Sequence, residues 1–509
     1  MTEWTRRALT RENAAILDRW LLRLGPLILL VLAFLYYGQY YRSDLNLGGE
    51  GGTAAVIAMR LNEGWLPIRD TFLGYNLMWF YPVAWLFQIL GPDYVALRIY
   101  FFAICLATAV VGFLVVRRVT SQGWLAVGTG ALLVLIPGMI FRNYMAFLPV
   151  LCGFLFLRAF VLEAPPGWRR WMWWAFAGAG LGLTLLTRVD LGIFLAVIAI
   201  GLVVLYPFGV RGEFLRRLPR AAAAGAVLVA TVVATHVPFA VDAERRGFGS
   251  DFLGQYPTEI NRLQYEFGKE VIPDAEPSAA IPPRSAWIRV ANPSVDSPGE
   301  VDGDTTRPRE TLNALFEQQS FYDAAFIIIL HLPMLIAAII FVVASTGLLW
   351  ALVARESDRR AAALTCLVTL GVALTLFPQY FFFRPDTPHL SEFMVPFLIA
   401  MVCACWHGVR WARNSWALKV PVFSFIALCL VGETLYFYHS FPKESAGTIA
   451  AKRKRSHEFV GDNGVRVWLK RRERERIASI HEAVVVHSQP DDWVITYPYS
   501  PTINFMTNR

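Results

Sequence analysis

Residues 24–41, LGPLILLVLAFLYYGQYY, contain no charged side chain. An α-helix needs about 20 mostly apolar residues to cross the roughly 30 Å hydrocarbon core of a bilayer. Similar uncharged runs stand at residues 171–187 and 361–377, and 56% of the chain is hydrophobic. A signal peptide would explain only one such run. We therefore predict an all-α polytopic membrane protein with about eleven transmembrane helices and additional juxtamembrane helices.

The basic residues between the apolar runs predict the orientation of the chain. Arg19 and Arg23 precede the first run, and later short loops carry pairs such as Arg117 and Arg118. Because cytoplasmic loops are enriched in Lys and Arg, we interpret the net charge of +8 as a topology signal and expect no nucleic-acid partner. The spans that fit this pattern lie near residues 24–41, 95–116, 122–141, 145–162, 171–187, 190–208, 221–240, 323–351, 361–380, 391–408 and 417–437.

Residues 75–90 are apolar but do not fit as a further span. If they crossed the membrane, every later basic loop would change sides. We expect an interfacial or juxtamembrane helix there, because Trp79, Tyr81 and Trp85 suit the headgroup region, where aromatic side chains are enriched.

This topology places three segments on the extracytoplasmic side. They are a first outer loop at residues 42–73, a long polar outer loop at 241–321, and a tail at 439–509. Residues 1–438 then form the transmembrane domain. The composition of the long loop, rich in Pro and acidic residues, predicts irregular structure over most of its length.

The tail is expected to form a small α/β extracytoplasmic domain. Its pattern predicts strands at 465–469 and 493–497 with a helix at 472–487 between them. The chain ends soon afterwards, so this unit could be incomplete. The basic run at 452–455 is expected to meet anionic membrane lipids. If that run is instead cytoplasmic, the predicted number of spans is wrong by one.

No cofactor follows from the sequence. All six Cys residues lie within or beside apolar runs, so neither a disulfide framework nor a CxxC metal site is predicted. Acids in the outer loops could hold a divalent cation, but no ligand spacing argues for a metal.

The first outer loop carries the acids that could act as a base at the membrane surface. Its sequence at 42–70 is RSDLNLGGEGGTAAVIAMRLNEGWLPIRD. Glu50 stands at the start of an expected amphipathic helix, where the helix dipole favours a carboxylate. Asp44, Glu63 and Asp70 are the other acids in this loop, and Asp44 and Asp70 are the alternative candidates. Any of these acids could equally be a solvated charge or a helix cap.

An ordered set of residues in and after this loop resembles the GT-C glycosyltransferases, in particular the protein O-mannosyltransferase and aminoarabinose transferase branch. The resemblance covers about residues 24–210 and is only topological beyond them. No single residue of the set is specific to these enzymes, whereas the order in which the residues occur is. The matching residues are Glu50, Gly64, Pro67, Arg69, Asp70, Pro82, Gly91 and Arg98.

The resemblance implies an inverting transfer of a sugar from a polyprenyl-phosphate donor to a glycan, lipid or protein acceptor. It also implies a site on the outer face of a bacterial inner membrane. Members of this branch usually carry Asp-Glu at the start of the loop helix, with the Asp as the catalytic acid, whereas this chain has Gly49-Glu50. Either Glu50 has taken over the role or Asp44 supplies it. We favour Glu50, then Asp44, then Asp70 or a site elsewhere.

A second candidate cluster lies at residues 377–393, FPQYFFFRPDTPHLSEF. Ionisable residues so close to the membrane are costly and are often functional. Arg384 could bind a lipid phosphate through its planar guanidinium, His389 could add a hydrogen bond, and Asp386 is a further candidate. The alternative is a proline-kinked turn in which Arg384 and Asp386 simply pair.

Weaker candidates complete the set. Arg69 and Arg188 could also hold the donor phosphate, although Arg188 and Asp190 could simply form an ion pair at a helix turn. His236 is at an outer helix end, where a hydrogen-bonded interfacial His is a better explanation than a ligand.

Two functions other than catalysis remain open from the sequence. A transporter is one, but the charged residues gather at the outer surface, and no internal repeat of the kind common in transporters is found. A non-catalytic scaffold derived from a GT-C enzyme is the other, because Gly49 replaces the expected Asp.

Overall fold

The computed structural model of the 509-residue chain describes most of the helical core and part of the tail. The described residues are 11–38, 41–42, 45, 50–70, 75–138, 140–162, 167–209, 214–257, 321–354, 356–378, 387–411, 456–489, 492, 494 and 501–508.

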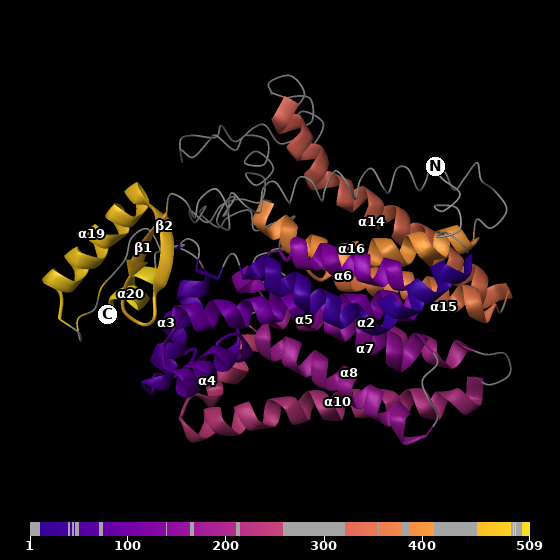
Figure 1. Cartoon of the computed structure of the whole chain (residues 1–509). Coiled ribbons are helices and arrows are strands. Elements are labelled where there is room, and N and C mark those ends of the chain that lie inside the picture. The colour runs from indigo at the N-terminus through magenta and orange to yellow at the C-terminus, as the bar shows by residue number, and fades with distance from the viewer. Residues whose placement is uncertain are drawn as a thin grey trace, which may run out of the picture.

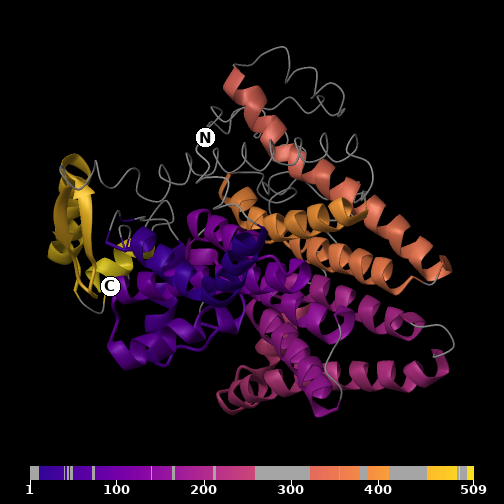
Figure 2. The same cartoon turned by 45° about the vertical axis from the view of Figure 1, so that its right-hand side comes forward.

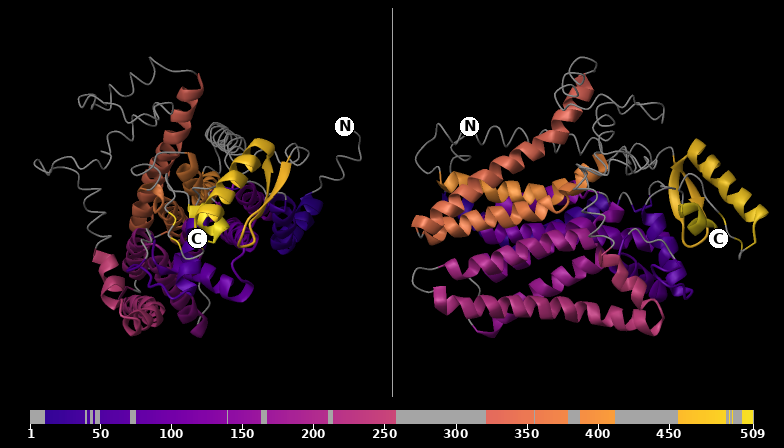
Figure 3. Two further views of the ribbon diagram at one scale, coloured as in Figure 1. Left: turned by 90° about the vertical axis from the view of Figure 1, so that its left-hand side faces the viewer. Right: turned by 180° about the vertical axis from the view of Figure 1, so that it is seen from behind.

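Long apolar helices run side by side and form the body of the molecule (Figures 1 and 3). Every predicted span up to 391–408 overlaps one of them, and the last predicted span, 417–437, lies outside the described residues. Seven helices of the described chain are long and apolar enough to cross a membrane. The protein is therefore a polytopic membrane protein. The helices of the body are α2 (Arg11–Tyr37), α5 (Tyr94–Thr120), α6 (Gly123–Leu135), α7 (Tyr144–Phe156), α8 (Trp168–Thr187), α9 (Val189–Leu205), α10 (Phe214–Arg245), α14 (Phe321–Ala354), α15 (Ser357–Leu374) and α16 (Thr387–Trp411).

The two ends of the bundle differ in chemistry. One end, here called the basic end, carries the arginines at the end of α5 and at the starts of α8, α10 and α15. There Arg360 donates a hydrogen bond to the Leu205 carbonyl at 3.1 Å, and Arg217 lies over the Tyr206 ring. The opposite end, here called the tail end, carries α3 (Glu50–Asn62), α4 (Tyr81–Leu90) and the C-terminal domain (Figure 1). The basic loops thus share one end, as the charge pattern predicts.

The segment at 75–90 does not form a span. It contains a short 3-10 helix, η1 (Leu77–Trp79), and then α4, whose 10 residues extend about 15 Å, half the thickness of a hydrocarbon core. The side chain of Asn76 accepts a hydrogen bond from the Leu77 N–H and caps η1. Gly91, at φ 77°, ends α4 in a conformation that favours glycine.

Close helix packing depends on glycines in α8. A Cβ atom placed on Gly178 would collide with the side chain of Thr231 in α10, and one on Gly182 would collide with Thr235. These glycines are four residues apart and so share a helix face. Small residues at such spacing let membrane helices approach each other, which is why α8 and α10 pack closely.

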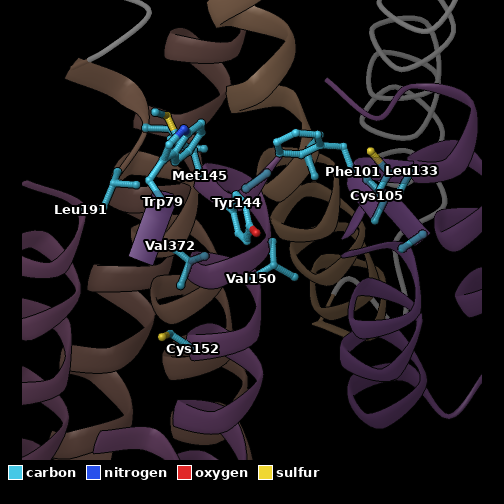
Figure 4. Packing of buried hydrophobic residues seen from close by; sticks show 14 of the residues in the cluster. Trp79, Phe101, Cys105, Leu133, Tyr144, Met145, Val150, Cys152, Leu191 and Val372 are labelled. Atoms are coloured by element: carbon cyan, nitrogen blue, oxygen red, sulfur yellow. The ribbon is translucent and has the colours of Figure 1, made fainter. Parts of the chain in front are cut away.

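Buried aromatic and aliphatic side chains fill the middle of the bundle. Figure 4 shows Trp79 of η1 beside Tyr144 and Met145 of α7, and the Trp79 and Tyr144 ring centroids are 5.5 Å apart. Because these three residues are buried, the segment before α4 is anchored in the core of the bundle.

The C-terminal domain pairs β1 (Ser456–Val460) antiparallel to β2 (Arg466–Lys470), followed by α19 (Arg471–His487) and the short α20 (Pro501–Thr507). β2 and α19 lie where the sequence predicts a strand and a helix. β1 was not predicted, and the strand predicted at 493–497 falls almost wholly outside the described residues.

Candidate functional site

Two buried arginines meet at one sulfur atom at the tail end of the bundle. Arg142 is the last residue of η2 (Ile140–Arg142), a turn between α6 and α7, and Arg188 lies between α8 and α9. Nη2 of Arg142 and Nη1 of Arg188 are each 3.1 Å from Sδ of Met145. A thioether is a weak hydrogen-bond acceptor, so it balances neither charge. The two cations therefore depend on other groups.

Each arginine has a buried carboxylate. Nε and Nη2 of Arg188 donate to the two carboxylate oxygens of Asp190, both at 2.7 Å, in a bidentate pair. Nε of Arg142 is 3.1 Å from Oε1 of Glu392, and each of these two side chains is only 2% exposed. With a neutral His389, the formal charges of the four ionic groups cancel, as burial requires.

Arg188 remains a cation in this setting. Burial alone would lower its pKa, but the charge of Asp190 and its hydrogen bonds outweigh burial and raise the pKa above the usual range. Glu392 also contributes to this rise, so the two ion pairs act on each other electrostatically. The two arginine–carboxylate pairs are therefore electrostatically coupled.

His389 contacts the other arginine. Its Nε2 lies 2.6 Å from Nη1 of Arg142. A guanidinium can only donate, so Nε2 accepts and the imidazole is neutral, with its proton on Nδ1. Arg142 also lies 5.9 Å from the centroid of Tyr75, whose ring stacks on Trp79 at 4.4 Å. The arginine is thus bordered by a histidine, a carboxylate, a thioether and an aromatic face.

Asn76 fixes Tyr75 in this arrangement. The Asn76 N–H donates to the Thr187 carbonyl at 3.0 Å, and its Nδ2 donates to the Leu185 carbonyl at 3.1 Å. The free carbonyls at the C-terminal end of α8 are satisfied by these bonds. The segment before η1 is therefore tied to the helix end that precedes Arg188.

The structure brings together three of the residues predicted from the sequence, namely Arg188, Asp190 and His389. Arg188 and Asp190 pair, as the simpler alternative predicted. Glu50 is the first residue of α3, and α3 packs against η2, the turn that ends at Arg142. The side chain of Glu50 lies outside the described part of the chain, as do Asp44, Arg384 and Asp386.

The remaining candidates lie apart from this cluster. Asp70 is exposed, and its Oδ2 accepts a hydrogen bond from the Leu66 N–H at 2.7 Å, so it stabilises the turn after α3. Arg69 is exposed and its Nη1 is 3.5 Å from the Gly247 carbonyl. Nδ1 of His236 is 2.8 Å from the carbonyl of Val232, one turn earlier in α10. That contact fits the interpretation of His236 as a hydrogen-bonded interfacial histidine rather than a ligand.

Arg142, Glu392 and Met145 were not predicted. Glu392 follows His389 by three residues and so shares its helix face, a signal that was present in the quoted string. Arg142 is an ionisable residue at the end of an apolar run, which is itself a reason to suspect function. Among the described residues, no three His, Cys, Asp or Glu side chains come together in a way that could hold a metal ion.

Comparisons with known proteins concern the fold. No family model and no curated protein matches the sequence. A solved structure of the apo oligosaccharyltransferase of Archaeoglobus fulgidus is similar over 100% of this chain and 65% of its own, with 14% identity and a TM-score of 0.51. This chain thus spans less than two thirds of that enzyme.

Two structures of ArnT from Cupriavidus metallidurans are also similar. The apo structure is 15% identical over 95% of this chain and 83% of ArnT, with a TM-score of 0.39. The structure with bound undecaprenyl phosphate is 15% identical over 95% of this chain and 84% of ArnT, with a TM-score of 0.40. The likeness to the oligosaccharyltransferase is the one that bears on the fold, and this chain accordingly has a fold like that of the archaeal enzyme.

Proposed function

We propose that this protein is an inverting glycosyltransferase that moves a sugar from a polyprenyl-phosphate donor to an acceptor at the tail end of the bundle. One observation carries the proposal: in a GT-C-like fold, the helix that begins with Glu50 packs against the turn that ends with Arg142. A carboxylate-bearing helix and the buried cluster of two arginine–carboxylate pairs thereby share one end of the membrane domain. The choice of a polyprenyl-phosphate donor rests on the resemblance of the first outer loop to that of the GT-C glycosyltransferases.

Glu50 is the proposed general base. Its carboxylate accepts the proton of an acceptor hydroxyl while the acceptor oxygen attacks the anomeric carbon of the sugar. The new glycosidic C–O bond forms as the C–O bond to the phosphate breaks, and the lipid phosphate leaves as an anion. Attack opposite to the leaving group inverts the anomeric configuration. General base catalysis of this kind contributes about 10² to 10⁴-fold in rate.

The leaving phosphate needs positive charge rather than a strong acid, and Arg142 is the best placed group among the described residues. Its Nη atoms contact a neutral imidazole nitrogen and a thioether sulfur. Phosphate oxygens accept charge-assisted hydrogen bonds more strongly than either. Arg142 also pairs through Nε with Glu392, whereas Arg188 commits both Nε and Nη2 to the two oxygens of Asp190. Arg384 and Arg69 remain proposed contributors from the sequence.

The proposed location is the inner membrane of a bacterium, with the tail end on the extracytoplasmic side. The arginines at the opposite end support this orientation, because basic residues collect in cytoplasmic loops. Acceptors of three classes, a glycan, a lipid or a protein, are compatible with a site at this surface.

The experiment uses purified protein in liposomes with labelled polyprenyl-phosphate sugars. Wild-type protein should transfer or release the sugar with inverted configuration. Glu50→Gln should lose about 10²-fold or more of this activity, the contribution expected of a base. Asp44→Asn should retain most of it, and Glu63→Gln, an exposed acid just beyond α3, is the matched control. Full activity of Glu50→Gln would refute the assignment, and movement of intact donor across the bilayer without chemistry would favour a transporter.

A further inference from the structure

The last helix, α20, is buried along its whole length. All seven residues from Pro501 to Thr507 are buried, among them the polar Thr502 and Asn504. Figures 1 and 2 show α20, in yellow, beside α3 at the tail end of the molecule. Nδ2 of the buried Asn504 donates a hydrogen bond to the Val494 carbonyl at 2.8 Å. Its burial indicates a fixed place against the membrane domain.

The start of α20 touches the first turn of α3. A Cβ atom on Gly52 would collide with Oγ1 of Thr502 and would lie 2.7 Å from the Thr502 N and 2.9 Å from its Cα. Two of these three atoms belong to the backbone, so a rotamer change would not relieve the clash. The two helices are therefore in contact where only glycine leaves room. Glu50 lies two residues before this contact.

The middle of α20 contacts the membrane domain through Phe505. Its ring centroid is 5.9 Å from Phe87 in α4 and 6.2 Å from Tyr94 at the start of α5. The Phe505 side chain is completely buried. Aromatic pairs at these distances contribute to packing beyond the area that they bury. The same helix thus touches α3, α4 and α5.

The turn between β1 and β2 holds α20 in this place. Nδ2 of Asn463 donates to the Phe505 carbonyl at 2.8 Å, and the Asp462 N–H donates to the Met506 carbonyl at 2.8 Å. The carbonyl of Asn463 in turn accepts from the Tyr94 N–H at 3.1 Å. This one turn of the tail therefore forms hydrogen bonds with both α20 and the start of α5.

We infer that α20 is a positioning element for the proposed catalytic helix: Thr502, seated on Gly52 and held by the β1–β2 turn, fixes the first turn of α3 and with it Glu50. This inference rests on the function proposed for Glu50. Thr502 and Phe505 are positioning residues, because they act through α3 and α4 rather than on a substrate. The tail domain then takes part in catalysis without contributing a reacting group.

Gly52→Ala tests the inference, with Gly201→Ala as the matched control. Both glycines lie in helices, but a Cβ atom on Gly201 meets nothing within 4 Å. Hydrogen exchange of the backbone amides of residues 54–57, which bond to the carbonyls of the first turn of α3, should rise at least tenfold in Gly52→Ala and stay unchanged in Gly201→Ala. The kcat for sugar transfer should fall at least tenfold while the KM for the donor stays within twofold.

A second variant keeps the test decisive if Gly52→Ala fails to fold. Phe505→Leu removes the ring contacts but remains apolar, and it should loosen the first turn of α3 in the same way, with the spans of the bundle unaffected. Unchanged exchange of the amides of residues 54–57 in the folded variants would overturn the inference. If wild-type protein transfers no sugar, the function proposed above fails, whereas the exchange experiment still reports whether α20 positions α3.

Discussion

The buried pair of Arg142 and Glu392 gives the sharpest stability prediction. Each side chain is 2% exposed, and Nε of the arginine is 3.1 Å from Oε1 of the glutamate. Glu392→Ala leaves a buried guanidinium without its carboxylate, and breaking a buried ion pair from one side costs about 3–5 kcal/mol. Replacing both residues by apolar side chains removes the uncompensated charge, so Arg142→Met combined with Glu392→Leu should recover most of this loss.

An exposed pair in the same chain provides the control. Nε of Arg359 is only 2.7 Å from Oε2 of Glu356, yet each of these two side chains is 42% exposed. Exposed ion pairs contribute about 0–1 kcal/mol because water screens them. Glu356→Ala should therefore change stability little, although its contact is the shorter of the two.

The assay is thermal unfolding in detergent, followed by tryptophan fluorescence at one fixed scan rate. We expect a large fall in the unfolding midpoint for Glu392→Ala, a small one for Glu356→Ala, and recovery of most of the larger fall in the Arg142→Met, Glu392→Leu double variant. Equal shifts for the two glutamate variants would refute the reasoning that burial, rather than distance, decides the contribution of these pairs. A double variant less stable than Glu392→Ala would refute it as well.

Three further predictions concern packing, titration and topology. Gly182→Leu should lower the unfolding midpoint by the equivalent of about 1–3 kcal/mol, because the new side chain would enter the space of Thr235, and thermal unfolding measures this loss. Burial raises the pKa of Tyr81 to about 12, so stability that is intact below pH 10 should fall as the pH rises towards 12. Tyr81→Phe should reduce that alkaline loss in a pH series of unfolding midpoints. Cysteines introduced singly at Glu63 and Arg169, which are exposed at opposite ends, should react with a membrane-impermeant maleimide from opposite sides of the bilayer, and labelling of both from one side would contradict the two-ended topology.

The membrane domain was predictable because its signal is local. A helix in lipid must satisfy its own backbone hydrogen bonds, so an uncharged run of sufficient length is enough to identify it. The prediction that α4 does not cross came instead from the charge pattern, because a crossing at residues 75–90 would move every later basic loop to the other side of the membrane. The helix that begins at Glu50 was also predicted, as an amphipathic helix with a carboxylate at its start, where the helix dipole favours one.

The charge cluster was predictable only in part because it depends on contacts between distant residues. Arg142 and His389 are 247 positions apart, and the sequence around each of them does not indicate that the other is its partner. His389 was recognised from its polar neighbours beside apolar runs, whereas Glu392 and Arg142 were not singled out. β1 was missed for a related reason, because Ser456–Val460 acquires its strand character by pairing with β2.

The contact between Gly52 and Thr502 also constrains how the protein is made. Synthesis proceeds from the N-terminus, so the first outer loop emerges hundreds of residues before the segment that packs on it. Insertion of the intervening spans therefore precedes the last step that shapes α3. Until residue 502 has been synthesised and delivered to the same face of the membrane, the inserted chain lacks the residue that packs on the first turn of α3.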